Sequence, residues 1–267
     1  ERLDVREGDK VNIKRAGDVI PQIISVDLDK RQNDSKKISL PKRCPCCKKD
    51  LIKIEGEAVL RCTAGLDCPA QKTGSLIHFV SRNAFNIDGL GERIIDLLVE
   101  QGLVSNFADL FRLKKDDIIE LEGFGEKSAN NLINSIQGSK ETTLSRFIYS
   151  LGIREVGEAT AMNLALNFNN VTNFLSANES DLLEINDIGP VASGFIQEFL
   201  SKSENVNLVK ELLKLGIDPK EIEINNNNPL STQSVVITGS FNTIARSILK
   251  EELIRVGARV SNSVSSN

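Results

Sequence analysis

The sequence predicts a multidomain, mainly α-helical chain with β structure near its start and a short α/β segment near its end. Three observations support this fold class: four cysteines fall within 25 residues, a long middle section has helical periodicity, and a glycine-centred turn recurs four times along it. With 267 residues and 40% hydrophobic content, the chain is long enough for about two domains or several smaller ones.

The charge of the chain is weakly acidic and unevenly distributed. The net charge is -4, but residues 1–50 carry thirteen Lys and Arg against nine Asp and Glu. A site for a polyanion is therefore expected to be local rather than a uniform basic coat. Because Tyr149 is the single tyrosine and tryptophan is absent, stacking of bases on aromatic rings is not expected to be the main binding mode. No run of residues approaches the length of a membrane span.

The first section, residues 8–27, has β-branched residues in short alternating runs that break at Gly17 and Pro21. This pattern is typical of two short strands of a small barrel. The polar stretch at 29–41 is expected to connect these strands to the cysteine segment.

The cysteine segment has the spacing C-x2-C-x14-C-x5-C and predicts one zinc site with the ligands Cys44, Cys47, Cys62 and Cys68. Zn²⁺ prefers four thiolates in a tetrahedron, and four protein ligands leave no open position, so the expected role is structural. Two disulfides or unrelated thiols fit less well, because the first knuckle is too compact and no secretory signal precedes it. Cys46 is interpreted as a bystander, and Lys48 stands where a glycine is more usual.

Residues 75–223 follow a helical period, with apolar residues spaced three and four apart, such as Ile94, Leu97 and Leu98, and predict an all-α section. His78 is expected to pack in this section rather than bind metal, because the four thiolates already fill the zinc site. Residues 225–228, followed by Pro229, are interpreted as a linker. The residues after the linker predict a strand at 235–239, an amphipathic helix at 244–256 and a turn into another strand.

The helical section repeats one element, a glycine-centred hairpin that leads into a helix. Its closing glycines are 34, 32 and 32 residues apart, which indicates an array of helix-turn-helix units. We number the turns hairpins 1 to 4, with first and closing positions Gly89 and Gly91, Gly123 and Gly125, Glu155 and Gly157, and Asp187 and Gly189.

A helix that starts at such a turn presents free N–H groups and a partial positive charge, and these bind phosphate without basic side chains. The expected partner is therefore the DNA backbone, contacted without sequence specificity, with Lys127 and Arg154 as helpers. Hairpins 3 and 4 are expected to bind less well, because Glu155 and Asp187 replace the first glycine. The alternative is a helical solenoid for protein partners, which has a similar period, although the signatures of tetratricopeptide and ankyrin repeats are missing.

Taken in order, these segments resemble the bacterial NAD-dependent DNA ligases. The resemblance rests on residues 14–21, 55–62, 68–71, 78–82 and 151–157. It implies the end of an oligonucleotide-binding (OB) fold at 1–40, a four-cysteine zinc finger at 41–72 and a helix-hairpin-helix domain of four repeats at 73–224. A linker at 225–231 and the beginning of an α/β BRCT domain at 232–267 would follow.

The resemblance also implies a function. Ligases of this family transfer AMP from NAD⁺, with Mg²⁺, to a Lys-x-Asp-Gly lysine and then seal nicks in duplex DNA. That motif is not found in the sequence, so no catalytic residue is assigned and the chain alone is expected to be inactive. Its expected part is to hold nicked duplex DNA as a monomer in the bacterial cytoplasm, near the nucleoid, with Lys14 and Arg15 close to phosphates. A free-standing helix-hairpin-helix repair adaptor and a zinc-stabilised protein scaffold are the alternatives.

Overall fold

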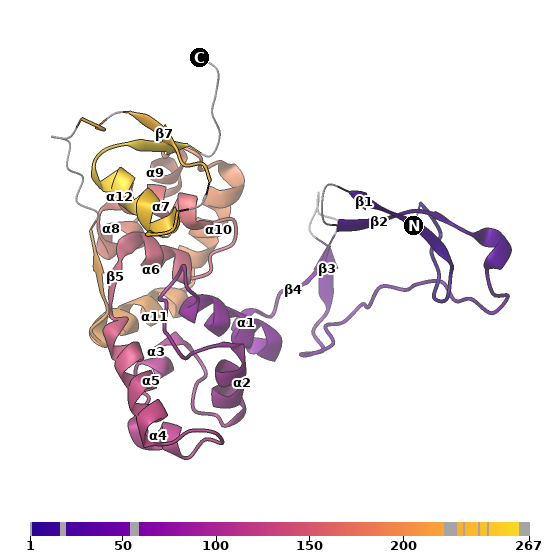
Figure 1. The fold of residues 1–267 in the computed structure, drawn as a ribbon, viewed down its shortest axis with the longest axis horizontal. Coiled ribbons are helices and arrows are strands. Elements are labelled where there is room, and N and C mark those ends of the chain that lie inside the picture. Colours follow the sequence, from indigo (N-terminus) through magenta and orange to yellow (C-terminus); the bar gives the residue numbers. More distant parts are fainter. Residues whose placement is uncertain are drawn as a thin grey trace. The chain divides into compact units, whose positions relative to one another are not determined.

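The computed structural model describes residues 2–16, 20–53, 59–221, 229–231, 233–239, 241–244 and 246–261. The chain divides into two compact units, Glu1–Pro69 and Ala70–Asn267, which are described separately (Figure 1). Gly17, the start of the 55–62 signature and most of the predicted linker lie outside the described residues. Among the described helices, none has the length and apolar character needed to cross a bilayer.

The first unit is built from short strands, and the second mainly from helices. The strands are β1 Val11–Ala16, β2 Ile20–Val26, β3 Leu51–Lys53, β4 Leu60–Cys62, β5 Glu141–Thr143, β6 Asp218–Lys220, β7 Ser234–Val236 and β8 Arg259–Ser261. The helices are α1 Pro69–Val80, α2 Glu92–Glu100, α3 Phe107–Leu110, α4 Lys115–Ile119, α5 Glu126–Gly138, α6 Leu144–Ser150, α7 Glu158–Phe168, α8 Val171–Leu175, α9 Glu179–Leu183, α10 Pro190–Ser201, α11 Ser203–Lys214 and α12 Arg246–Arg255.

The two strands predicted near the start are confirmed. β1 and β2 pair antiparallel, with an irregularity in register between Asn12 and Ile13. An ion-pair network connects this hairpin to the following segment: Arg31 donates hydrogen bonds to both carboxylate oxygens of Asp9, at 2.9 and 2.8 Å, and to Asp4 at 2.9 Å. The bond from Arg31 lowers the pKa of Asp9. Planar guanidinium groups suit such forked contacts with carboxylates.

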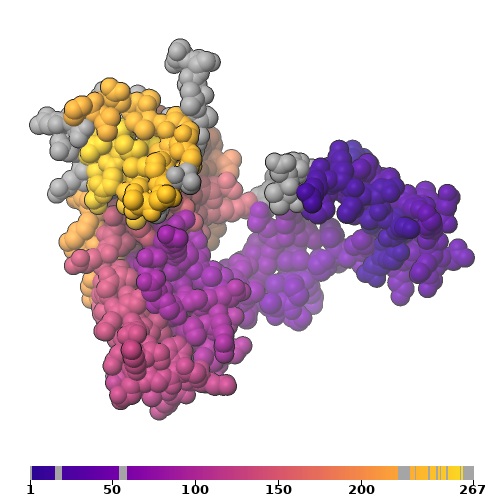
Figure 2. All heavy atoms as spheres, in the orientation of Figure 1, coloured from indigo at the N-terminus to yellow at the C-terminus, as the bar shows by residue number. Residues whose placement is uncertain are grey.

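No described residue of 2–43, indigo in Figure 2, is buried as a whole, and the side chain of Asp9, which is fully buried beside Arg31, is polar. Several large apolar side chains are exposed there, including Ile13 at 63%, Ile20 at 69% and Leu40 at 68%. Hydrophobic burial therefore contributes little to the stability of this segment. Its hydrogen bonds and ion pairs fix its conformation instead.

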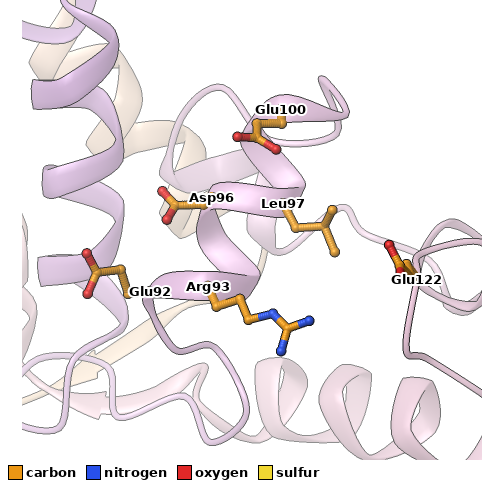
Figure 3. Close-up of a pocket in the computed structure, with 6 residues that line it drawn as sticks. All are labelled: Glu92, Arg93, Asp96, Leu97, Glu100 and Glu122. Carbon is orange, nitrogen blue, oxygen red and sulfur yellow. The ribbon is translucent and has the colours of Figure 1, made fainter.

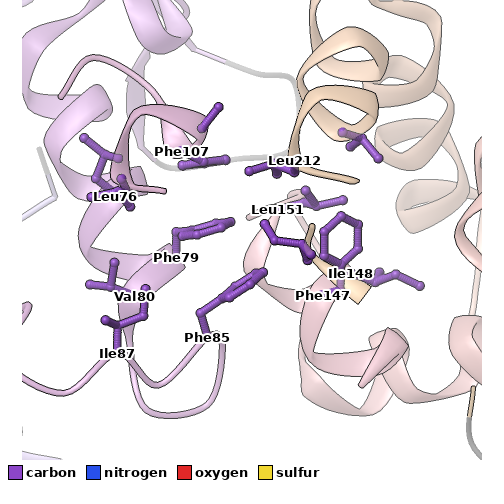
Figure 4. Packing of buried hydrophobic residues seen from close by; sticks show 14 of the residues in the cluster. Leu76, Phe79, Val80, Phe85, Ile87, Phe107, Phe147, Ile148, Leu151 and Leu212 are labelled. Atoms are coloured by element: carbon purple, nitrogen blue, oxygen red, sulfur yellow. The ribbon is translucent and has the colours of Figure 1, made fainter. Parts of the chain in front are cut away.

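The helical unit has one continuous hydrophobic core. Phe79 of α1 stacks on Phe85 and Phe107, with ring centroids 4.3 and 4.4 Å apart, and contacts Phe111 edge-on at 6.1 Å. Figure 4 shows Phe79, Phe85 and Phe147 converging between α1 and α6. Buried aromatic pairs add stability beyond their buried area. The core therefore joins parts of the chain that are far apart in the sequence.

The helical section departs from the all-α prediction in one place. β5 pairs parallel with β6, and the N–H of Asp218 donates to the carbonyl of Lys140 at 3.0 Å. Three-residue strands are too short to change a helical period, which explains why the sequence pattern did not show them. The β5–β6 pair connects the residues before α6 to the residues that follow α11.

The last part of the helical unit forms a small α/β segment. β7 pairs parallel with β8, and α12 lies between them in the sequence. Parallel strands need such a crossover connection. The predicted strand, helix and strand are confirmed, whereas the BRCT assignment stays a prediction.

Ser193 in α10 gives a test of core packing. The residue is fully buried, and its hydroxyl has no hydrogen-bond partner within the described part of the chain. Because an unpaired buried hydroxyl costs about 1–3 kcal/mol, Ser193→Ala is expected to raise the free energy of unfolding by ~1 kcal/mol. Urea denaturation followed by circular dichroism measures this change.

Ser150 is the matched control for Ser193. It is also fully buried, but its hydroxyl donates to the carbonyl of Phe147 at 2.7 Å. Ser150→Ala is expected to lower the free energy of unfolding by about 1 kcal/mol, because it leaves that carbonyl without this partner. Equal changes in the free energy of unfolding for the two substitutions would contradict the assignment of the Ser193 hydroxyl as unpaired and the Ser150 hydroxyl as paired.

Candidate zinc centre and nucleic-acid interface

The four cysteines predicted as zinc ligands come together. The sulfurs of Cys44 and Cys68 are 3.9 Å apart, those of Cys47 and Cys62 are 3.5 Å apart, and all four lie within 4.8 Å of one another. Zn–S bonds of about 2.3 Å in a tetrahedron place sulfurs about 3.8 Å apart, so the cluster fits a zinc ion. Cys46 is exposed and is not part of the cluster.

Backbone geometry in the first knuckle positions the sulfurs. The N–H of Cys44 donates to the carbonyl of Lys49 at 2.8 Å, and the N–H of Lys48 donates to the carbonyl of Cys44 at 3.0 Å. Lys48 has a φ of 61°, a conformation in which glycine is more usual. The N–H groups of Cys47 and Cys46 donate to the sulfur of Cys44 and lower its pKa to about 6. The turn therefore directs two backbone amides at the Cys44 sulfur.

The second half of the cluster comes from β4 and the turn that follows it. β3 and β4 pair antiparallel, which places Cys62 opposite Leu51. The N–H of Lys49 favours the thiolate of Cys47, but burial and the neighbouring sulfurs of Cys62, Cys44 and Cys68 raise the pKa of Cys47 to about 12. Four sulfurs this close do not all ionise without a cation, and binding of Zn²⁺ displaces their protons.

His78 lies in the helical unit and takes no part in this cluster. Its Nε2 is 2.8 Å from the carbonyl oxygen of Tyr149, and its ring meets the Tyr149 ring edge-on at 4.7 Å. The prediction that His78 packs within the helical section is confirmed.

All four hairpins share one turn geometry. The central apolar residue is buried in hairpins 1, 3 and 4 and half-buried in hairpin 2. In each turn its N–H donates to the carbonyl three residues earlier, at 3.1 to 3.2 Å: Leu90 to Ile87, Phe124 to Leu121, Val156 to Ile153, and Ile188 to Ile185. The repeat read from the sequence is therefore a repeat in space.

The first turn position has a positive φ in every copy: 89° at Gly89, 85° at Gly123, 61° at Glu155 and 64° at Asp187. Residues with a Cβ pay about 1–2 kcal/mol for this conformation. The two acidic residues adopt it nevertheless. At this position hairpins 3 and 4 thus differ from hairpins 1 and 2 in side-chain charge, not in backbone conformation.

The closing glycines differ from the first turn positions in having a negative φ. Gly91, Gly125, Gly157 and Gly189 are the N-caps of α2, α5, α7 and α10, with φ values of -78°, -133°, -83° and -88°. A Cβ built on any of them would meet nothing within 4 Å. Neither backbone conformation nor internal crowding therefore requires glycine there. Its effect is to leave the space in front of each helix open, so that an external group can approach the amides closely.

Each of these helices is anchored in the core by a buried residue four positions after the glycine. The residue is fully buried in every copy, and its N–H donates to the glycine carbonyl at 2.8 to 3.0 Å: Ile95, Ala129, Ala161 and Ser193.

Basic side chains are distributed unequally over the hairpins. Lys127 is exposed and is the second residue of α5. Arg93 occupies the same position in α2 and was missed in the sequence analysis, although its offset from Gly91 matches that of Lys127 from Gly125. Arg154 is half-buried and packs over the Phe195 ring at 4.5 Å. In the first unit, Lys14 and Arg15 are exposed on β1.

Two surface hollows flank the first hairpins. One has a volume of about 560 Å³, and Figure 3 shows Arg93 and Leu97 pointing toward the Glu122 side of it. Its lining is mostly acidic and includes Glu92, Asp96 and Glu100, which are spaced one turn apart on α2. Phosphate groups are repelled from this flank.

The second hollow lies directly beside hairpin 1 and also has a volume of about 560 Å³. Arg82, Ser81 and Gly91 are among its lining residues. This side of hairpin 1 is therefore less acidic than the flank formed by α2. Any phosphate contact is expected at the hairpin tips and on this side.

Family models match four parts of the chain. Residues 1–35 match the NAD-dependent DNA ligase OB-fold domain, and residues 43–70 match the NAD-dependent DNA ligase C4 zinc finger domain. Residues 82–137 match a SAM-like helix-hairpin-helix tandem, and residues 146–209 match a helix-hairpin-helix motif. Hairpins 1 and 2 thus fall in one match, and hairpins 3 and 4 in the other.

Curated proteins with similar sequences are DNA ligases. The DNA ligase of Hahella chejuensis is 48% identical over 266 residues, which are 99% of this chain and 39% of that protein. The DNA ligase of Legionella pneumophila strain Corby is 44% identical over 268 residues, with 99% and 40% covered. The chain therefore spans about two fifths of the length of these relatives.

The fold and the matches together define a chain made of DNA-binding domains. These are an OB-fold segment, a four-cysteine zinc finger and tandem helix-hairpin-helix units. More narrowly, the OB-fold and zinc finger domains are those of the NAD-dependent DNA ligases, and the resemblance drawn from the sequence is confirmed.

Proposed function

We propose that this chain is the DNA-holding portion of an NAD-dependent DNA ligase, which seals nicks between 5′-phosphate and 3′-hydroxyl ends in duplex DNA. One observation carries the proposal: in all four hairpins, a closing glycine that the fold does not require leaves the start of a helix open. Hairpin 4 offers one amide fewer than the others, because its helix begins with Pro190, which has no N–H. Similarity to DNA ligases over 99% of the chain favours this function over a free-standing adaptor.

Phosphates of the duplex bind at the hairpin tips. Aligned peptide dipoles place a partial positive charge at each helix start, which explains how a chain with a net charge of -4 holds a polyanion. The contacts reach the backbone and not base edges, so binding is independent of sequence. The proposed contact residues are Lys14, Arg15, Gly89, Gly91, Gly123, Gly125, Lys127, Arg154, Gly157 and Gly189.

The zinc ion is structural. Cys44, Cys47, Cys62 and Cys68 hold it, and four thiolate ligands leave no coordination position open for chemistry. Among the described residues of 43–70 only Cys44 and Cys68 are buried, so the metal is the main organising feature of the finger. Zinc binding and folding of the finger are then one event.

The chemistry of the whole enzyme belongs to other residues. AMP transfer from NAD⁺ with Mg²⁺ needs a Lys-x-Asp-Gly lysine, a motif that is not found in this sequence. This chain holds and orients the nick as a monomer, which lowers the entropic cost of bringing the reacting ends into position. The place of action is the bacterial cytoplasm, at the nucleoid.

Salt dependence of duplex binding tests the proposal. If the four proposed basic contacts, Lys14, Arg15, Lys127 and Arg154, each neutralise one phosphate, the logarithm of the association constant falls with the logarithm of salt concentration with a slope of about -4. Fluorescence anisotropy with nicked and intact duplexes of several sequences measures it. A slope near zero, or strong preference for one base sequence, contradicts backbone binding through the hairpins.

A further inference from the structure

Residues 81–86, here called the link segment, connect α1 to hairpin 1 and are held by the second half of the helical section. Arg146 of α6 donates from Nε to the carbonyl of Ala84 at 2.9 Å and from Nη2 to the carbonyl of Arg82 at 2.5 Å. A guanidinium has a planar fork of donors, so two simultaneous bonds fix the direction of the segment as well as its distance.

A second contact joins the link segment to hairpin 3. The side-chain amide of Asn83 donates to Oε1 of Glu158 at 2.7 Å. Glu158 is the first residue of α7 and directly follows the closing glycine Gly157. The contact therefore ends at the turn that is proposed to face the duplex.

Apolar packing supports these polar contacts from inside. Phe85 of the link segment meets Phe147 of α6 edge-on at 6.2 Å, and both rings are buried (Figure 4). Next to the link segment, His78 contacts Tyr149 at 2.8 Å. The link segment thus touches α6 with both its backbone and its side chains, and α7 with Asn83.

These contacts cross between the two helix-hairpin-helix pairs, since hairpin 1 lies within residues 82–137 and hairpin 3 within 146–209. We propose that Asn83, Arg146 and Glu158 form a brace that fixes hairpin 1 relative to hairpin 3, so that both pairs engage one duplex together. This inference rests on the proposed DNA-holding function. The three residues are positioning residues, and none of them is required to touch DNA.

A fixed spacing has a measurable consequence. When one pair is bound, a rigid brace presents the other pair at a high effective concentration, whereas a loose connection does not. A duplex long enough for both pairs should therefore gain affinity over a duplex that accommodates one pair. A residue that only stabilises the fold would change binding to both duplexes alike.

Exchanging donor and acceptor in the Asn83–Glu158 contact tests the brace. Asn83→Asp places two carboxylates together and breaks the hydrogen bond, whereas Asn83→Asp combined with Glu158→Gln restores it in the opposite direction. The double variant has the same net charge as the original pair. Asn167→Asp adds one negative charge to an exposed position of α7 outside the brace and is the matched control for charge.

Affinities are measured for duplexes of about one and about two helical turns, ~10 and ~20 base pairs. For Asn83→Asp we expect the advantage of the longer duplex to fall by about 10-fold. We expect the double variant to regain this advantage and Asn167→Asp to keep it. The brace is overturned if the ratio of the affinities for the longer and the shorter duplex is unchanged in Asn83→Asp. It is also overturned if the double variant does not regain the original ratio.

Hydrogen exchange of the protein without DNA separates failure of the brace from failure of the proposed function. Amides of residues 81–91 should exchange faster in Asn83→Asp and return to the original rate in the double variant. Amides of hairpin 4 should not change. If the unaltered chain binds neither duplex, the DNA-holding function fails, and the exchange rates alone decide whether the contacts fix hairpin 1. Identical exchange in all variants overturns the brace.

Discussion

Replacing Cys62 by serine is expected to abolish zinc binding and unfold residues 43–70. The sulfur of Cys62 lies 3.5 Å from that of Cys47 and within 4.8 Å of the two other sulfurs. In small fingers zinc binding supplies about 10–16 kcal/mol of folding free energy at neutral pH, and nothing else in the described part of this segment matches that contribution. Among the described residues of the first unit, Cys44 and Cys68 are the buried apolar ones.

Native mass spectrometry and limited proteolysis measure this effect. The unaltered chain should carry one zinc ion and Cys62→Ser none, with rapid cleavage inside residues 43–70. Cys46→Ser is the matched control, because the Cys46 thiol is exposed and outside the cluster, and this variant should keep its zinc ion. Protection of the segment in Cys62→Ser without metal would show that the zinc ion does not hold the finger together.

Replacing Gly125 by serine is expected to weaken duplex binding without loss of stability. Gly125 has an extended φ of -133° and open space around the position of a Cβ. Serine is also a good N-cap, so α5 keeps its start, but the new side chain occupies the space in front of the amides. We expect the dissociation constant to rise at least ~10-fold, which corresponds to about 1.4 kcal/mol.

Gly138 is the control in the same helix. It stands at the other end of α5, and a Cβ there also meets nothing within 4 Å. Gly138→Ser should bind the duplex as tightly as the unaltered chain. Gly123 is less suitable for this test, because its φ of 85° would add backbone strain to any steric effect on DNA. Equal affinities of the Gly125 and Gly138 variants would mean that hairpin 2 does not touch DNA.

The zinc centre and the hairpins were predictable from sequence for physical reasons. A four-cysteine spacing specifies its own geometry, since the metal imposes a tetrahedron on whatever chain carries the ligands. A Gly-hydrophobe-Gly turn favours a positive φ followed by an apolar anchor, and in hairpin 1 Gly89 has a φ of 89° and Leu90 is buried. Local chemistry decides both features.

Features that depend on distant contacts were not predictable. The backbone of Glu155 and Asp187 adopts the conformation of the glycines in hairpins 1 and 2, although both residues weaken the local signal. The surrounding packing offsets the energetic cost of this conformation, because the buried side chains of Val156 and Ile188 anchor the turns. The bonds from Arg146 to Arg82 and Ala84 connect residues more than sixty positions apart, and periodicity carries no information on such pairs.

The carboxylates of α2 affect the orientation in which a duplex can bind to the protein. Glu92, Asp96 and Glu100 line one hollow beside hairpins 1 and 2. Like charges one turn apart weaken a helix by a few tenths of a kcal/mol, so this arrangement is slightly unfavourable for α2 itself. When hairpin 1 holds a phosphate as proposed, the same strand is repelled if it tilts toward α2. The approach angle of the double helix is then selected by repulsion, and misaligned encounters dissociate quickly.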